Sequence, residues 1–178
     1  MWGLSLNQYK AMHMTESPFE MRFDPQTINH LGLRMYSTLP PALAELISNS
    51  YDADATNVII TLMEVKGKPK EIKIDDDEIG LSYDDIINKF LVIGRNRRND
   101  DGDVPSTKHN RLPTGKKGLG KLALFGLAKT ITILTRQNGK LNEFVLDWDD
   151  LMLATGTYRP RAKRINEDTK DSDGTLIT

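Results

Sequence analysis

The sequence predicts a two-layer α/β (α+β) sandwich, in which helices cover one face of a mixed, mainly antiparallel sheet. Helical patterns are interspersed with pairs of strand-like segments joined by short turns, whereas alternating βαβ units would separate the strands by helices. The chain has 178 residues, of which 38% are hydrophobic, and this is enough for one core but hardly for two independent domains. We therefore expect one principal domain.

Two stretches are typical of helices that bury one side. In residues 40–51, prolines stand at the start and apolar residues recur at helical spacing. The expected buried stripe consists of Leu43, Leu46 and Ile47. In residues 81–94, Ser82 is a candidate N-cap, with Asp85 three residues later as in a capping box. The inward side chains of this second helix are expected to be Ile86, Ile87, Phe90 and Leu91.

Strand-like segments come in pairs. Residues 56–65 are rich in β-branched side chains and reach residues 71–75 through a turn-like segment, which predicts a hairpin. A second hairpin is predicted for residues 130–135 and 142–148, on either side of the turn sequence RQNGK. Residues 174–178 begin another strand. The charged stretch before it, from residue 152, shows no pattern typical of an element.

A long polar stretch, residues 94–114, separates these elements from a helix predicted over residues 119–129. A segment of this length inside a compact domain is usually a functional lid or disordered. Basic clusters occur at its root and near the C-terminus: Arg95, Arg97 and Arg98, and Arg159, Arg161, Lys163 and Arg164. Both clusters are typical of solvated loops, and the first is also placed to contact phosphate or DNA.

Composition excludes several classes of function. The formal net charge of -1 argues against nucleic-acid or membrane binding over the whole surface. With no cysteine and three scattered histidines, the chain has no disulfide framework and is unlike a zinc protein. It also has no apolar run of membrane-spanning length and no signal-peptide pattern, so we expect a cytoplasmic, intracellular protein without a membrane partner.

The helix over residues 40–51 has a polar face as well as an apolar one. Glu45, Asn49 and Asp52 follow at i, i+4 and i+7 and therefore share one side. Such a face is common on surface helices. Chemically, the carbonyl oxygen of Asn49 suits a hard cation such as Mg²⁺, and Glu45, one turn earlier, is placed to act as a general base on a nearby water.

An acidic run, residues 75–78, follows the first hairpin. It is either a solvated hairpin end or the source of one buried carboxylate. A buried carboxylate accepts hydrogen bonds only, which suits the exocyclic amine of an adenine. Gly80 would let the backbone approach a flat base closely.

The sequence GKKGLGKLALFGLA begins at Gly115 and fits the phosphate-loop pattern GxxxxGK. The next residue, however, is Leu122 rather than Ser or Thr, and no buried strand precedes the loop. Backbone N–H groups of a glycine-rich turn at a helix N-terminus still form an anion site, to which Lys121 adds a charge. Glycine-rich turns before helices also occur for packing alone.

Four motifs occur together and in a fixed order: ELISNSYDA, IDDDEIGLS, GKKGLGKLA and DGTLI. In this order they resemble the motifs of the GHKL superfamily, which comprises gyrase, the large heat-shock chaperones, histidine kinases and the MutL mismatch-repair proteins, and which uses the Bergerat ATP-binding fold. The resemblance extends from about residue 30 to the C-terminus. It implies an ATP-binding domain over residues 30–178 that stops before any transducer domain, with residues 1–29 as an N-terminal extension or arm.

The resemblance implies a role for each matching residue. Glu45 would polarise the attacking water, Asn49 would hold Mg²⁺, and Asp52 would support the pocket. Asp76 would bind the adenine amine, and Thr175 would help through its hydroxyl and a water. The remaining cofactor-binding residues would be Gly80 beside the base and, around the phosphates, Gly115, Gly118, Leu119, Gly120 and Lys121. ATP and Mg²⁺ are thus the expected ligands, and metal-assisted hydrolysis of ATP is the expected reaction.

The chain departs from the family pattern at one position and in its extent. Glu78 stands where the family motif has its first glycine, which predicts weaker nucleotide binding or a rearranged loop. In the family, a following transducer domain usually adds a lysine to the γ-phosphate, whereas this chain stops three residues after Thr175. ATP binding is therefore the primary expectation, and turnover the secondary one.

Within the superfamily, NHLGLRMYSTLPPALAELISNSYDA and KFLVIGRNRR look most like the microrchidia (MORC)-type and related bacterial ATPases. That resemblance implies ATP-dependent homodimerisation of a longer, clamp-like protein, with DNA as a partner of downstream regions. ELISNSYDA is also similar to the heat-shock chaperone version, and a mismatch-repair type stays open. A different class of function, a non-hydrolysing ATP switch for dimerisation, is the competing hypothesis.

Overall fold

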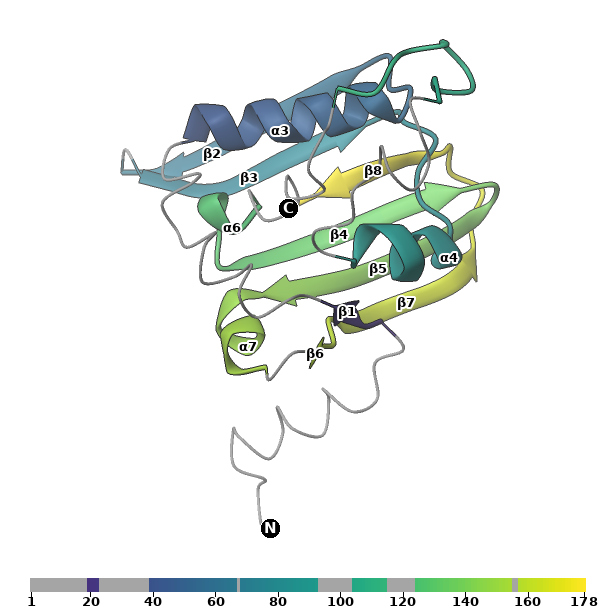
Figure 1. Cartoon of the computed structure of the whole chain (residues 1–178). Helices are drawn as coiled ribbons and strands as arrows, with labels where there is room; N and C mark the ends of the chain where they lie inside the picture. The colour runs from purple at the N-terminus through teal and green to yellow at the C-terminus, as the bar shows by residue number, and fades with distance from the viewer. Residues whose placement is uncertain (1–18, 23–38, 67, 93–103, 115–123, 155–156) are drawn as a thin grey trace.

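The computed structural model describes residues 19–22, 39–66, 68–92, 104–114, 124–154 and 157–178. Six strands form one sheet in the order β2-β3-β8-β4-β5-β7, and every neighbouring pair is antiparallel (Figure 1). These strands are β2 (Val58–Val65), β3 (Lys68–Asp76), β8 (Gly174–Ile177), β4 (Thr130–Gln137), β5 (Lys140–Asp147) and β7 (Arg161–Asp168). The predicted fold class is therefore confirmed.

The other described elements are short, apart from one helix. They are α3 (Leu39–Asp52), α4 (Tyr83–Asp85), the π-helical turn η1 (Ile86–Phe90), α6 (Leu124–Leu127), α7 (Trp148–Leu153) and a two-stranded ribbon of β1 (Met21–Arg22) and β6 (Thr157–Tyr158). In Figure 1, α3 runs along β2 and β3, and α4 lies over β4 and β5. Among the described residues, no helix is both long and apolar enough to cross a membrane.

Both predicted hairpins form, and a turn of defined chemistry joins the second. Asn138 and Gly139 connect β4 to β5 with φ angles of 52° and 74°. Two consecutive residues with positive φ are what a tight hairpin turn of type I′ requires, and Asn-Gly is the sequence that adopts it most readily. The predicted strand at the C-terminus is β8.

Strand β7 is a correction to the sequence-based prediction, which found no element between residues 152 and 173. β7 pairs with β5 at one edge of the sheet, and most of its residues are exposed. Lys163 and Arg164 both form ion pairs with Glu143 on β5, at 3.0 and 3.1 Å. A charged edge strand has no buried face, so it lacks the alternation of apolar and polar residues by which strands are recognised.

Helix α3 buries a different stripe from the one predicted. Leu46 is buried as expected and Leu43 packs against the core, but Ile47 is 42% exposed, so that part of the prediction is wrong. The residues at the centre of the buried side are instead Ala42, Leu46 and Ser50, spaced four apart. Because Ser50 is small and donates a hydrogen bond to the buried Asp76 carboxylate, this polar side chain lies on the buried side of the helix.

The predicted cap after the acidic run is present. Ser82 Oγ accepts a hydrogen bond from the Asp85 amide at 3.0 Å and donates one to the Asp85 carboxylate at 2.6 Å. Ile86 and Leu91 are fully buried as predicted, and Ile87 and Phe90 pack against the core. After α4 the helix continues as the wider π-helical turn, in which the Leu91 amide donates a hydrogen bond to the Ile86 carbonyl, five residues earlier, at 2.8 Å.

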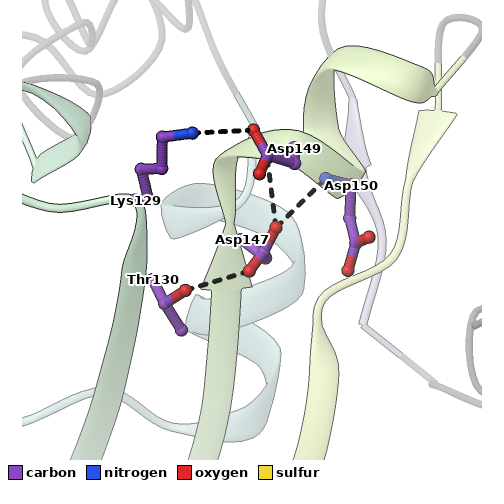
Figure 2. Close-up of polar contacts among 5 residues, drawn as sticks. All are labelled: Lys129, Thr130, Asp147, Asp149 and Asp150. Carbon is purple, nitrogen blue, oxygen red and sulfur yellow. Dashed lines mark hydrogen bonds and ion pairs between the residues drawn. The ribbon is translucent and has the colours of Figure 1, made fainter.

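Helix α7 begins where β5 ends, through the side chain of Asp147 (Figure 2). One Asp147 oxygen accepts hydrogen bonds from the Asp149 and Asp150 amides at 3.1 and 3.2 Å, and the other accepts from Thr130 Oγ1 at 3.0 Å. Lys129 forms an ion pair with Asp149 at 3.5 Å. The residue that caps the helix thus also joins β5 to the start of β4.

Candidate functional site

The register of the sheet arranges inward side chains in two neighbouring rows. Directly opposite residues of an antiparallel pair point to the same face. One row is polar and consists of Asp76, Thr175, Thr135 and Asn142. The next row, two residues along each strand, is apolar and consists of Ile60, Ile74, Ile177, Ile133 and Phe144. Polar groups from four strands therefore lie beside an apolar floor, although their positions in the sequence are far apart.

A pocket of about 400 Å³ opens over the end of these rows, between the sheet and α3. Its polar lining includes Asn49, Ser50, Asp52, Asp76, Glu78 and Thr175. Its apolar lining includes Leu46, Ile79, Leu81, Phe90, Ile133 and Ile177. Mainly apolar walls with a few converging polar groups are typical of a small-molecule site.

Asp76 lies at the floor of the pocket, and its side chain is held by donors from three elements. Ser50 Oγ donates to Oδ2 at 2.6 Å, while the Glu78 and Thr175 amides donate to Oδ1 at 3.3 and 3.1 Å. Asp76 is 9% exposed, and this burial raises the pKa of its carboxyl above the ordinary value. An ionised carboxylate has four acceptor positions, so three donors leave one for a ligand.

Glu78 is buried rather than solvated, at 8% exposure. Its Oε1 accepts a hydrogen bond from Thr175 Oγ1 at 2.6 Å. Burial, together with the nearby Asp76 charge, raises the pKa of Glu78 to about 8. Its burial next to Asp76 therefore favours the acid form of Glu78 over the charged form.

Gly80 lies in a backbone region that favours glycine, and its surroundings leave no room for a side chain. Its φ is +68°, and a Cβ at this position would lie 1.9 Å from the Arg136 carbonyl oxygen. The Gly80 carbonyl accepts a hydrogen bond from Gln137 Nε2 at 3.1 Å. The loop after β3 is thus pressed against the end of β4, which leaves room for the pocket on its other side.

Two of the three residues on the polar face of α3 line the pocket. Asn49 and Asp52 line it, whereas Glu45, one turn earlier, is half-buried and does not line it. The Asn49 side chain is exposed and makes no hydrogen bond with another described residue. Asp52 is buried, and its Oδ1 accepts hydrogen bonds from both the amide and the hydroxyl of Thr114 at 2.8 Å.

Residues 104–114, the described part of the predicted lid, are attached to the C-terminal end of α3. Asp54, whose φ is 68°, accepts hydrogen bonds from Ser106 Oγ and from the Lys108 and His109 amides. Arg111 donates to the Ala55 carbonyl at 2.7 Å and stacks on the Tyr51 ring, with its guanidinium carbon 4.4 Å from the ring centroid. These contacts come in addition to those of Asp52 with Thr114.

The attached segment ends at Thr114, next to a residue that lines the pocket. The predicted phosphate residues Gly115, Gly118, Leu119, Gly120 and Lys121 lie outside the described residues, as do Arg95, Arg97 and Arg98.

Sequence reasoning missed two residues of the site. Ser50 orients Asp76, and Thr135 Oγ1 accepts a hydrogen bond from the Leu81 amide at 2.8 Å. A signal for Ser50 existed, because it follows Leu46 at helical spacing on the buried stripe. No comparable signal marked Thr135, since its place beside Thr175 depends on the register of two strands that are distant in the sequence.

Comparisons with known proteins agree with this arrangement. Residues 36–175 match the family described as histidine kinase-, DNA gyrase B-, and HSP90-like ATPase. A protein named as type II restriction enzyme HgiDII, from Herpetosiphon aurantiacus, is 35% identical over 151 residues, which cover 83% of this chain and 23% of that protein. The chaperone protein HtpG from Buchnera aphidicola subsp. Baizongia pistaciae (strain Bp) is 26% identical over 181 residues, which cover 90% of this chain and 27% of HtpG.

The chain therefore spans about a quarter of the length of these two curated relatives. The family match runs from before α3 to Thr175 and so includes the elements that form the pocket. The predicted resemblance to the GHKL superfamily is confirmed, while the microrchidia-type subfamily stays a prediction. The chain belongs to the histidine kinase-, DNA gyrase B- and HSP90-like ATPases, a family of ATP-binding domains.

Proposed function

We propose that the pocket between α3 and the sheet binds ATP, with the adenine against Asp76. The observation that carries this proposal is the buried Asp76 carboxylate, which keeps one acceptor position in a pocket whose walls are mainly apolar. An exocyclic amine is a donor that fills this position, and the flat ring fits between apolar walls. Thr175, whose amide bonds Asp76, supports the base through its hydroxyl and a water, and Gly80 lets the backbone approach the ring.

The phosphates would extend from the base toward the C-terminal end of α3. Asn49 lines the pocket with a side chain that has no partner among the described residues, so its amide oxygen is available to Mg²⁺. Among the described residues no three His, Asp or Glu side chains gather into a metal site. This fits Mg²⁺, which commonly takes few protein ligands beside phosphate and water oxygens. When bound, the metal would neutralise charge on the phosphate oxygens.

The chain's own residues would close the phosphate site. Asp52, which lines the pocket, holds Thr114, the last described residue before the glycine-rich sequence. We propose that the backbone amides of Gly115, Gly118, Leu119 and Gly120 surround the phosphates and that Lys121 pairs with them. Backbone donors and a lysine are well suited to this task, because phosphoryl transfer depends chiefly on positioning and charge stabilisation.

Glu45 is the proposed catalytic residue. It would take up a proton from the attacking water as the water oxygen bonds to the γ-phosphorus and the bond from that phosphorus to the β-phosphate oxygen breaks, giving ADP and phosphate. Glu45 lies one helical turn from Asn49 but outside the pocket lining, so water would have to reach it over the phosphate end of the site.

Calorimetric titration of the chain with Mg-ATP tests the binding proposal. We expect Asp76→Asn to weaken ATP binding about tenfold or more, because an amide in the same place loses the charge and one acceptor. Asp75→Asn is the matched control, since Asp75 is the neighbouring residue of β3 and is exposed. Equal affinities of wild type and Asp76→Asn would refute the proposed base site.

Phosphate release from the longer protein distinguishes an ATPase from a non-hydrolysing switch. If Glu45 is catalytic, Glu45→Ala retains ATP binding and loses phosphate release by about a hundredfold or more. A wild-type protein that binds ATP and dimerises without releasing phosphate would instead establish the switch.

For the whole protein we propose a cytoplasmic, ATP-dependent homodimer in which residues 30–178 are the ATP-binding domain. DNA is the proposed partner of regions outside this domain, in line with the microrchidia-type resemblance and with the name of the restriction-enzyme relative. A heat-shock chaperone function is the second candidate and is favoured by the similarity to HtpG. Light scattering of the longer protein with a non-hydrolysable ATP analogue, with and without DNA, separates these proposals.

A further inference from the structure

Glu78 lies beside the proposed base-binding carboxylate and has one side-chain oxygen still available. Its amide donates to Asp76 Oδ1, and its side chain lines the same pocket. Its Oε1 accepts from Thr175 Oγ1, whereas Oε2 has no hydrogen-bond partner among the described residues. A polar atom without a partner, on a largely buried residue that lines a pocket, is a group that a ligand can satisfy.

Thr175 contacts one oxygen of the Glu78 carboxyl group, Oε1, by a hydrogen bond. Thr175 Oγ1 lies 2.6 Å from Glu78 Oε1 and 2.9 Å from Thr135 Oγ1, but it has one proton to donate. We take that proton to be donated to the closer oxygen, Oε1 of Glu78, which is then an acceptor. In this arrangement the acid form of Glu78 carries its proton on Oε2.

The charges around the pocket favour the acid form. Asp76 is the carboxylate nearest to Glu78, and Asp52 lines the pocket from α3. Asp85 and Lys89 also line the pocket, but they form an ion pair with each other at 2.6 Å. From β4, the Arg136 guanidinium lies close to Gly174. Burial next to Asp76 raises the pKa of Glu78 to about 8.

We propose that Glu78 reads the purine ring, with its Oε2–H donating a hydrogen bond to the ring nitrogen next to the exocyclic amine, so that Asp76 and Glu78 together select adenine. This inference rests on the proposed function, because it places the base at Asp76. Adenine presents a donor amine beside an acceptor nitrogen, N1, which matches an acceptor carboxylate beside a donor acid. At the same edge, guanine presents an acceptor oxygen beside a donor N1–H, so it is mismatched at both positions.

Titration with ATP, with 1-deaza-ATP, which has C–H in place of N1, and with GTP tests the inference. At about pH 6 we expect wild type to bind ATP about tenfold more tightly than 1-deaza-ATP, and GTP most weakly. At about pH 9.5, above the pKa of Glu78, the preference for ATP over 1-deaza-ATP should disappear. Glu78→Gln should keep the preference at both pH values, because its amide N–H donates in either case, whereas Glu78→Ala should lose it.

The outcomes separate this inference from the function on which it rests. If wild type binds ATP and 1-deaza-ATP equally at about pH 6 while Asp76→Asn weakens both, Glu78 does not read the ring and the ATP site stands. If wild type binds none of the nucleotides, both proposals fail. The comparison of the two nucleotides on wild type at two pH values needs no variant, so it decides the question even if Glu78→Gln does not fold.

Discussion

At the scale of single residues, Asp76 and Glu78 form a pair of buried carboxyl groups whose environments differ. Asp76 accepts hydrogen bonds from two amides and a hydroxyl, all of which favour its ionised form. Glu78 accepts one, from Thr175, and it is next to the Asp76 charge. Burial raises the pKa of both carboxyl groups, and the larger number of hydrogen bonds to Asp76 favours Asp76 as the ionised member of the pair.

The Glu78 environment predicts a loss of stability with rising pH. Its pKa is about 8 in the folded protein and 4.5 in an ordinary environment, so between these values the folded state binds a proton that the unfolded state has released. The free energy of unfolding should therefore fall between about pH 5 and about pH 8.5. Urea unfolding measures this decrease, and in Glu78→Gln the decrease should be smaller by about 1 kcal/mol or more. A wild-type curve as flat as that of the variant would contradict the assignment.

Gly80 and Gly139 form a natural pair for testing the loop after β3. Both have positive φ, but a Cβ at Gly80 would lie 1.9 Å from a backbone oxygen, whereas at Gly139 the nearest atom would be 3.7 Å away. Gly139→Ala should lower the free energy of unfolding by about 1 kcal/mol, from backbone strain alone. Gly80→Ala should cost about 2 kcal/mol more, because the backbone must also move. Similar costs for the two variants would show that the loop is not pressed against β4.

At this scale the sequence predicted groups with a local signature and missed those without one. Asp76 and Gly80 could be predicted because they are four residues apart in one motif. The burial of Glu78 could not, since it depends on Thr175 from a strand at the other end of the chain. Ile47 was misplaced because helical periodicity gives the width of an apolar stripe but not the direction in which the helix faces the sheet.

At the scale of elements, the site depends on the register of the sheet. The pairing of β8 with both β3 and β4 brings Asp76, Thr175 and Thr135 into one row. Because side chains alternate along a strand, a shift of one residue in β8 would move Thr175 to the opposite face. The two hairpins were predicted from their turns. The position of β8 between them was not predicted, because no turn links β8 to either neighbour and a strand can pair with the edge of either hairpin.

Another element-scale feature is the attachment of residues 104–114 to the end of α3. Asp54→Ala removes the acceptor of the Lys108 and His109 amides, so hydrogen exchange at these two amides should accelerate about tenfold or more. Asp168→Ala, which removes an exposed partner of Lys140, is the control and should leave them unchanged. If Asp54→Ala also leaves the exchange unchanged, the segment is held by other contacts.

At the scale of the whole molecule, residues 19–22 belong to the same folded unit as the sheet. Phe19 and Met21 are fully buried, and the Phe19 ring centroid is 5.0 Å from that of Phe144 on β5. The family match begins at residue 36, so this packing is additional to the part of the chain that defines the family. Residues 19–22 precede residue 30, within the stretch 1–29 for which the sequence predicted an extension or arm.

This packing predicts a large effect of one substitution. Phe19→Ala should lower the free energy of unfolding by about 3 to 5 kcal/mol, with a single transition, because a buried aromatic ring is lost from the common core. Leu153→Ala is the control: Leu153 is 75% exposed, and its substitution should cost about 0.5 kcal/mol or less. Equal effects of the two variants in denaturant unfolding would show that residues 19–22 are not part of this core.

The central claim, that ATP binds between α3 and the polar row of the sheet, is tested most directly by mapping backbone amide resonances of the chain during titration with Mg-ATP. We expect saturable shifts around residues 46–53, 76–81 and 174–177, the segments that contribute residues to the pocket lining, and little change in β7 or α7. Saturable shifts centred on β7 or α7, or none at millimolar ATP, would contradict the claim.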